Sequence, residues 1–317
     1  MRTMPLGNTT ADVSCLCFGA MRLGTNNDYP QSCELLDMFV EAGGDFIDTA
    51  NVYSKWYTGG KGGESEAVLG RWMAERGNRE ELFIATKVGV DYQDTPMSLG
   101  ADAIARECDR SLERLGTDRI DLYYAHLDVR TTPLAETLEA FDKLIRAGKV
   151  RFIGASNYRA WRLADADAIC LGSGWESFCC VQQRYTYLRP NPGADFGLQV
   201  SANEDLLDYC RDRGMTLLPY SPLLGGSYAR QDKPTPAQYA GPDADARLAA
   251  LRTVADEAGA TIHQVVLAWM LHHDQSVLPV FSASNPDQMR ENLGAVDVAL
   301  TPEQVSRLNE AAAHVNP

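Results

Sequence analysis

The strongest constraint on the fold is a regular alternation of two kinds of segment along the chain. Short apolar runs of strand length alternate eight times with amphipathic segments of helix length. This order predicts parallel βα units rather than a block of strands followed by a block of helices. The length of 317 residues would suit two small domains or one large barrel. Because eight units close a barrel, we predict an α/β fold, a (β/α)8 TIM barrel, as one domain over residues 1–317.

The alternation also predicts where each element lies. Strands are predicted at Ser14–Phe18, Phe46–Asp48, Phe83–Lys87, Leu122–Ala125, Phe152–Ala155, Cys180–Gln182, Thr216–Pro219 and Val277–Val280. Helices are predicted at Gln31–Ala42, Ser65–Arg76, Leu99–Arg114, Leu134–Ala147, Tyr158–Ile169, Glu204–Arg213, Thr261–His273 and Pro286–Leu293. Glycines such as Gly148 and Gly214 stand just past predicted helices, where a left-handed residue commonly ends a helix.

Two segments fall outside the eight units. In residues 1–13, the pair Gly7-Asn8 predicts an N-terminal β-hairpin that plugs the barrel floor. The segment Leu223–Arg247 is rich in proline and has no periodicity, so it predicts a long loop after strand seven. Such loops at the carboxyl face of a barrel are usually functional, and we expect this one to cover a cofactor.

The charge balance bounds the kind of partner. The chain has 29 Lys and Arg residues against 43 Asp and Glu residues, which argues against a nucleic-acid surface and favours an enzyme for small molecules. No stretch approaches about 18 uninterrupted apolar residues, and the N-terminus lacks the pattern of a signal peptide. We therefore expect a cytoplasmic protein without membrane contact, and its oligomeric state stays open.

The cysteines and paired histidines do not predict a metal site. The eight cysteines form no CxxC pair, and Cys15, Cys17, Cys179 and Cys180 lie in apolar, strand-like runs, as small buried hydrophobes do. The adjacent histidines at 272 and 273 would point about 100° apart on a helix, so they cannot ligate one ion together.

Four polar residues stand at the ends of predicted strands: Asp48, Tyr53, Lys87 and His126. In a parallel barrel these ends meet at one face, so the four side chains should converge. An ammonium beside the Tyr53 phenol should lower the phenol pKa from its ordinary value of about 10. A phenol tuned in this way can exchange a proton with a carbonyl oxygen, with His126 as a second donor. This chemistry requires a source of hydride.

A dinucleotide would have to be held without a Rossmann fingerprint. The best partial match to that motif, Gly172–Gly174, is better explained as a loop. Barrel loops and helix N-termini are the alternative, with Ser156 and Asn157 after strand five and Gln182 after strand six.

At this point the chain resembles a known family, the aldo-keto reductases, from Arg2 to about Asn309. Besides Lys87 and His126, the segments that carry the resemblance are DTANVYS (Asp48–Ser54), GESEAVLG (Gly63–Gly70), IGASN (Ile153–Asn157), VQQRY (Val181–Tyr185), PYSPLLGG (Pro219–Gly226) and SASNPDQMREN (Ser282–Asn292). The resemblance implies a (β/α)8 barrel that binds a nicotinamide cofactor across its carboxyl face. It also implies that Asp48, Tyr53, Lys87 and His126 form a catalytic tetrad with Tyr53 as general acid/base.

The same resemblance implies a cofactor site and a substrate pocket. Ser156, Asn157 and Gln182 would hold the carboxamide, and Tyr220 would stack on the nicotinamide ring. Leu223 and Gly225 would lie along the pyrophosphate, and the adenosine end would be surrounded by Ser282, Ser284, Gln288, Glu291 and Asn292. The full implied cofactor set is Gly19, Ala20, Met21, Asp48, Ser156, Asn157, Gln182, Tyr220, Ser221, Leu223, Gly225, Ser282, Ser284, Gln288, Glu291 and Asn292. The implied substrate pocket is Met21, Tyr53, Trp56, Tyr57 and His126.

One departure from the family concerns the choice of nucleotide. NADP-preferring members often place Lys or Arg on the 2′-phosphate, whereas this chain has Ser282 and Gln288 there, with Arg290 as the nearby cation. NADP is the expected cofactor, and use of NAD stays open. The expected substrate is an aldehyde or ketone or the matching alcohol, of sugar or aryl type.

Two alternatives to a reductase are compatible with a barrel of this kind. One is a regulatory subunit that senses the cofactor, against which the intact tetrad argues. The other is a lyase with Lys87 as a Schiff base, against which the pairing of Lys87 with Asp48 and Tyr53 argues.

Overall fold

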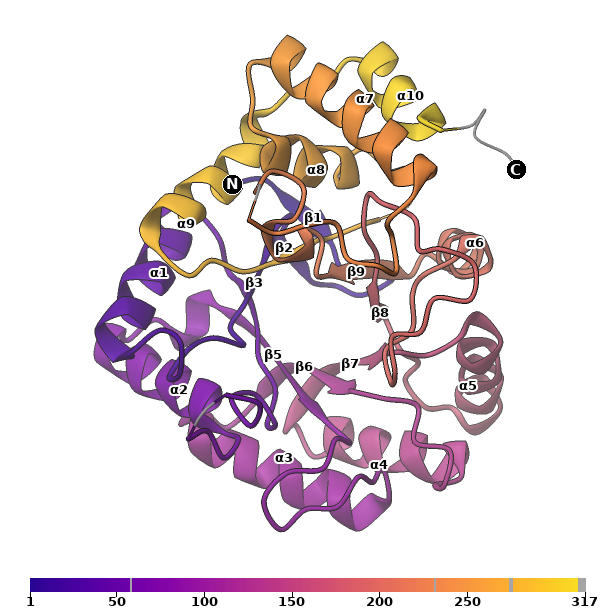
Figure 1. Cartoon of the computed structure of the whole chain (residues 1–317). Helices are drawn as coiled ribbons and strands as arrows, with labels where there is room; N and C mark the ends of the chain where they lie inside the picture. Colours follow the sequence, from indigo (N-terminus) through magenta and orange to yellow (C-terminus); the bar gives the residue numbers. More distant parts are fainter. Residues whose placement is uncertain (58, 231, 274–275, 313–317) are drawn as a thin grey trace.

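The computed structural model describes residues 1–57, 59–230, 232–273 and 276–312, and its centre is a closed barrel of parallel strands (Figure 1). Around the barrel the strand order is β10-β3-β4-β5-β6-β7-β8-β9. The barrel strands are β3 (Cys17–Gly19), β4 (Phe46–Asp48), β5 (Phe83–Val88), β6 (Ile120–Ala125), β7 (Val150–Ser156), β8 (Cys180–Arg184), β9 (Thr216–Tyr220) and β10 (Val280–Phe281). The predicted fold class is therefore confirmed. Residues 313–317 of the predicted domain lie outside the described part.

Helices surround the strands as an outer ring (Figure 1). The ring consists of α1 (Tyr29–Glu41), α2 (Glu64–Arg76), α3 (Ala101–Leu115), α4 (Leu134–Arg146), α5 (Ala160–Ser173), α6 (Glu204–Arg213), α8 (Ile262–Met270) and α9 (Pro286–Leu293). Among the described residues, three short 3-10 helices lie in the connections: η1 (Arg79–Glu81), η2 (Leu224–Gly226) and η3 (Gly294–Asp297). None of the helices in the described ranges is long and apolar enough to cross a membrane.

Two further helices were absent from the sequence prediction. The helices α7 (Pro242–Ala258) and α10 (Pro302–Glu310) lie together outside the ring, next to α8 (Figure 1). The predicted loop Leu223–Arg247 is therefore wrong from Pro242 onward. Pro242, one of the prolines that favour a loop in the sequence, stands in the first turn of α7, where its missing N–H costs no hydrogen bond.

The predicted first and last barrel strands were displaced along the chain. The prediction Ser14–Phe18 runs across the end of one strand and the start of another, because the chain turns at residues 15–16. The prediction Val277–Val280 begins too early, since Val277 makes only an isolated bridge to Leu217 before β10 starts. Both segments are mostly apolar, so hydrophobicity alone could not place their ends.

The N-terminal hairpin plugs the barrel floor, as predicted. The strands β1 (Thr3–Pro5) and β2 (Asp12–Ser14) pair antiparallel, and Leu6 and Val13 pack among inward-facing side chains of the barrel. Gly7 has a φ of 55°, and a Cβ there would lie 2.1 Å from the carbonyl oxygen of Cys179. Only glycine can make this turn so close to the β8 backbone.

The inward-facing side chains form an apolar layer with a polar layer above it. Phe46, Ala85, Tyr124 and Cys180 belong to the apolar layer. Because side chains alternate along a strand, the residue two positions further on each strand faces inward at the carboxyl end. These residues are Asp48, Lys87, His126 and Gln182. The cysteines are free, and all but the half-buried Cys179 are buried, as expected for small hydrophobes.

Candidate active site

Lys87 is the centre of the polar layer, and the predicted tetrad is assembled around it. Its Nζ forms a short ion pair with Asp48 Oδ1 and donates to the Tyr53 hydroxyl at 2.8 Å. The Tyr53 hydroxyl also lies 3.5 Å from Asp48 Oδ1. The His126 ring lies edge-on to the Tyr53 ring at a centroid distance of 6.0 Å. The structure therefore brings together all four residues that the sequence singled out.

The hydrogen bonds of Lys87 decide what this amine can do. Asp48 Oδ1, the backbone oxygen of Thr49 at 2.7 Å and the Tyr53 hydroxyl take its three N–H groups. The side chain is 0 % exposed. An ammonium that is fully hydrogen-bonded and closed off from solvent has no lone pair for a carbonyl, which argues against Lys87 as a Schiff base.

Asp48 is held on both of its carboxylate oxygens. Oδ1 accepts from Lys87, and Oδ2 accepts from Gln182 Nε2 at 2.8 Å. The side chain is 1 % exposed, so its charge depends on these partners rather than on water. The resemblance placed Gln182 on a nicotinamide carboxamide, but in this structure its amide nitrogen is bound to Asp48.

Burial sets the ionisation of the tetrad. The pKa of Tyr53 lies well above its ordinary value, because the phenol is desolvated and, next in weight, because the Asp48 carboxylate is close. The expected lowering of the Tyr53 pKa by Lys87 was therefore wrong, since it left out desolvation and the second charge. Burial also lowers the pKa of Lys87, and the Asp48 charge opposes this effect. The resulting Tyr53 is a neutral phenol that can donate a proton.

His126 stands directly after β6 and is held by its backbone. Its N–H donates to the oxygen of Val88 at 2.8 Å, and its oxygen accepts from Asn157 Nδ2 at 3.0 Å. Burial, and then the charge of Lys87, lower the pKa of the imidazole well below its ordinary value. Its Nδ1 is buried without a hydrogen-bond partner among the described residues. The residue as a whole is half-exposed, so part of this neutral side chain reaches solvent beside Tyr53.

Asn157 organises the segment where the resemblance places the nicotinamide. Its Oδ1 accepts from the Tyr220 hydroxyl at 2.8 Å and from Val200 N at 3.0 Å, and its Nδ2 also donates to Ser156 Oγ at 3.1 Å. Asn157 and Ser221 have φ values of 60° and 56°, in the left-handed region that non-glycine residues seldom adopt. Strain of this kind persists only where the surroundings hold it, and it gathers at functional sites.

The turn after β9 carries a positive charge at the place predicted for the pyrophosphate. Lys233 Nζ donates to the oxygen of Gly225 at 2.8 Å, and it lies 3.9 Å from where a Cβ of Gly225 would be. Gly225 has a φ of 62°, so glycine keeps this turn open. The ammonium was missed by the sequence analysis, because nothing local links position 233 to position 225.

The residues predicted for the adenosine end form a small network around α9. Gln288 Oε1 accepts from Ser284 N at 2.9 Å, Asn292 Nδ2 donates to the oxygen of Ser282 at 3.2 Å, and Glu291 pairs with His263 Nδ1 at 3.3 Å. Arg290 is different, because its side chain is 63 % exposed and paired with Asp287 on the outside of the helix. The Ser282 and Gln288 side chains are neutral, and Arg290 does not join them in this network.

Aromatic side chains of the β4–α2 loop border one side of the tetrad. The Trp56 ring lies 6.4 Å from the Tyr53 ring, and this tryptophan is 57 % exposed. Met21 packs against the cluster that contains Tyr53, and Ala20 N donates to the oxygen of Asp48 at 2.8 Å. Tyr57 is half-exposed in the same loop. A Cβ on Gly19 would lie 3.2 Å from the oxygen of Phe281, so only glycine fits easily between the ends of β3 and β10.

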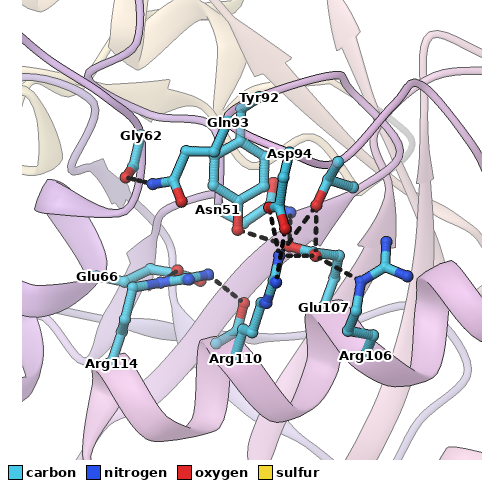
Figure 2. A network of polar contacts seen from close by, with 12 residues as sticks. Asn51, Gly62, Glu66, Tyr92, Gln93, Asp94, Arg106, Glu107, Arg110 and Arg114 are labelled. Atoms are coloured by element: carbon cyan, nitrogen blue, oxygen red, sulfur yellow. Dashed lines mark hydrogen bonds and ion pairs between the residues drawn. The ribbon is translucent and has the colours of Figure 1, made fainter.

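Sequence analysis missed a buried carboxylate beside the tetrad. Glu107 of α3 is 0 % exposed and accepts a hydrogen bond from Asn51, two residues before Tyr53 (Figure 2). A signal was available, because Glu107 stands among buried residues of α3 such as Ile104 and Cys108. A charge on the buried face of a helix requires partners.

Comparisons with known proteins agree with this geometry. The sequence pattern of the Aldo/keto reductase family matches residues 15–313. The uncharacterized oxidoreductase YrpG of Bacillus subtilis is 32% identical over 96% of this chain and 94% of its own length. The norsolorinic acid reductase stcV of Emericella nidulans is 32% identical over 94% of this chain and 78% of its own.

A solved structure supports the same assignment. The thermostable aldo-keto reductase Tm1743, solved in complex with the inhibitor epalrestat, aligns with a TM-score of 0.77 and 28% sequence identity, over 98% of this chain and 100% of that one. The chain belongs to the aldo/keto reductase family of oxidoreductases.

Proposed function

We propose that this protein reduces an aldehyde or ketone, or oxidises the matching alcohol, with NADP(H) as hydride carrier and Tyr53 as general acid/base. The observation that carries the proposal is the Tyr53 hydroxyl, which receives a hydrogen bond from the buried Lys87 ammonium and lies beside the neutral ring of His126. A proton donor held in this way, at the mouth of a barrel, is the group that a developing alkoxide needs.

The chain's own residues account for the proton side of the reaction. Reduced nicotinamide, when bound, supplies the hydride to the carbonyl carbon. Tyr53 gives its phenolic proton to the carbonyl oxygen, and the Lys87 ammonium at 2.8 Å stabilises the phenolate that is left. Asp48 keeps this ammonium charged and fixed. His126, as a neutral ring beside Tyr53, helps to orient the substrate.

The described residues fit a nicotinamide dinucleotide at three places. The neutral, half-exposed His126 ring beside Tyr53 leaves a polar side chain for a ligand at the reacting end. Lys233 at Gly225 provides positive charge for a diphosphate. The N-terminus of α9, with Asn285 as its cap, lies beside Gln288 and Ser284 at the adenosine end. Titration calorimetry with NADPH and with NADH tests the proposal. If the protein bound neither nucleotide, the proposal would be removed.

The pH dependence of reduction follows from the two shifted groups. Because the pKa of His126 is lowered, the ring stays neutral above that lowered value. Because the pKa of Tyr53 is raised, the phenol stays protonated below that raised value. We expect kcat/KM for reduction to be flat between about pH 6 and about pH 8. An inflection near about 6.5, the ordinary pKa of histidine, would contradict the neutral assignment of His126.

The preference between nucleotides should be modest. A charged partner on the 2′-phosphate adds about 1.5–3 kcal/mol, and the Ser282 and Gln288 side chains carry no charge. We expect NADP(H) to be favoured over NAD(H) by about tenfold in kcat/KM. Arg290→Ala should leave this ratio unchanged, because Arg290 points outward to Asp287.

A matched substitution distinguishes the diphosphate from the 2′-phosphate. Lys233→Ala should weaken NADP(H) and NAD(H) alike, since both carry the diphosphate that Lys233 would meet. Loss of the preference in Arg290→Ala would mean that Arg290 turns inward when the nucleotide binds.

A further inference from the structure

Glu107 is a buried carboxylate whose hydrogen-bonding capacity is used in full. Oε2 accepts from Asn51 Nδ2 at 3.1 Å and from the Tyr92 hydroxyl at 2.6 Å. Oε1 accepts from Thr95 Oγ1 at 2.8 Å and from Arg110 Nη1 at 3.0 Å. Figure 2 shows Asn51 and Tyr92 meeting at Glu107, with Arg110 beside it. A carboxylate has about four acceptor positions, and these four donors fill them, while Arg106 Nε lies 3.5 Å from Oε1 as a further charge.

Three of these donors come from the two loops that flank the tetrad, and Arg110 comes from α3 itself. Asn51 lies in the β4–α2 loop, two residues before Tyr53. Tyr92 and Thr95 lie in the β5–α3 loop, which begins just after Lys87 and β5. One side chain outside the barrel therefore ties together the segments that carry the proton donor and its ammonium partner.

The site is built to keep the carboxylate charged. Burial works to raise the pKa of Glu107, but three side-chain hydrogen bonds and the charge of Arg110 outweigh it, so the pKa lies below its ordinary value. The charge-assisted bonds to Asn51 and Tyr92 are thereby stronger and more directional than bonds between neutral groups.

The loop that carries Tyr53 needs such an anchor. Ser54, directly after Tyr53, has a φ of 86° and is fully buried. A non-glycine residue holds this conformation only where its surroundings impose it. The Tyr53 ring also packs in one cluster with Tyr92, the ring that Glu107 holds by its hydroxyl. A small shift of this loop would move the Tyr53 hydroxyl away from Lys87.

We propose that Glu107 is a positioning residue for proton transfer, which acts through its hydrogen bond to Asn51 and holds the Tyr53 hydroxyl in line with Lys87. The assignment rests on the proposed reductase function and adds a residue that touches neither substrate nor nucleotide. A misplacement of a catalytic group by about 1 Å can cost about 10²-fold in rate. Loss of the Glu107 anchor should therefore displace the Tyr53 hydroxyl and lower kcat.

The decisive substitution is Asn51→Asp, which places a second carboxylate against Glu107 where the amide donated. We expect kcat to fall by about 10- to 100-fold. The KM for the nucleotide should stay within about twofold, and the solvent deuterium isotope effect on kcat should rise, because proton transfer becomes slower. Adding Glu107→Gln to Asn51→Asp restores an amide–carboxylate pair, and kcat should recover most of the loss.

Thr95→Val is the matched control. This substitution removes a hydrogen bond to the same carboxylate, from the β5–α3 loop instead of the β4–α2 loop. The melting temperature of Thr95→Val should fall about as much as that of Asn51→Ala, while kcat stays within about twofold of wild type. Where Asn51→Asp yields no folded protein, Asn51→Ala removes the hydrogen bond alone and should lower kcat by about tenfold.

Three results would overturn the assignment: unchanged kcat in the folded Asn51 variant, an equal loss in Thr95→Val, or a double variant no better than Asn51→Asp. Failure of the reductase function itself is distinguishable, because the wild-type protein would then reduce no carbonyl with NADPH or NADH.

Discussion

Replacing Tyr53 by phenylalanine is expected to lower turnover by about 10²- to 10⁴-fold, the usual worth of a general acid. The substitution removes the proton that Tyr53 would give to the carbonyl oxygen. It keeps the ring that packs against Tyr92 and His126. Binding of the nucleotide should therefore survive, and stability should change by only about 1 kcal/mol, the worth of the lost hydrogen bond to Lys87. Steady-state kinetics together with titration of NADPH separate the two effects.

Tyr123→Phe is the matched control for this substitution. Tyr123 is a fully buried tyrosine of β6 whose hydroxyl has no hydrogen-bond partner among the described residues. The same chemical change there should leave turnover unaltered and should not reduce stability. Near-wild-type turnover in Tyr53→Phe, on a substrate for which chemistry is slow, would show that another group supplies the proton.

Replacing Asp48 by asparagine is expected to destabilise the protein by about 3–5 kcal/mol at neutral pH, because the buried Lys87 ammonium would lose its charge partner. This loss of unfolding free energy relative to wild type, the stability deficit, should depend on pH. Burial already lowers the pKa of Lys87 against the opposing charge of Asp48, and removal of that charge lowers it further. An unfolded lysine, with a pKa of about 10.4, then binds its proton more tightly than the folded one. Stability of the variant therefore rises with pH up to about 10.4, and the deficit shrinks.

Urea unfolding of wild type and variant at about pH 7 and about pH 9.5 measures this change. Asp91→Asn is the control, since it breaks another Lys–Asp pair, between Lys55 and Asp91, that is 33 % and 54 % exposed. An exposed pair contributes about 1 kcal/mol or less, and its loss should show no comparable relief at higher pH. A deficit in Asp48→Asn that stays constant with pH would mean that Lys87 is not the group left uncompensated.

Much of the site was accessible from the sequence, because strand ends in a parallel barrel are a local property. Asp48, Lys87 and His126 each follow an apolar run by a short and regular spacing, and the pleat of a strand then dictates which side chains face inward. The polar layer could therefore be predicted before any contact was known. The N-terminal hairpin was also predictable, since Gly7-Asn8 is a turn signal by itself.

The remaining features depend on contacts between segments far apart in the chain. Desolvation raises the Tyr53 pKa, although a lysine beside a phenol taken alone predicts the opposite. The fold leaves Arg290 exposed on the outside of α9, so it pairs with Asp287 and does not face a phosphate site. Pro242 starts α7 rather than continuing a loop.

Glu107 shows the same division within one residue. Its sequence context reveals a charge on the buried face of a helix, whereas its partners come from two separate loops and appear only when the chain is folded. The amino-acid sequence by itself determined which side chains reach the carboxyl face of the barrel, because the periodicity of strands and helices is set by neighbouring residues. Only the tertiary structure decided their charges and partners, because desolvation and hydrogen bonding depend on whatever other segments pack around each group.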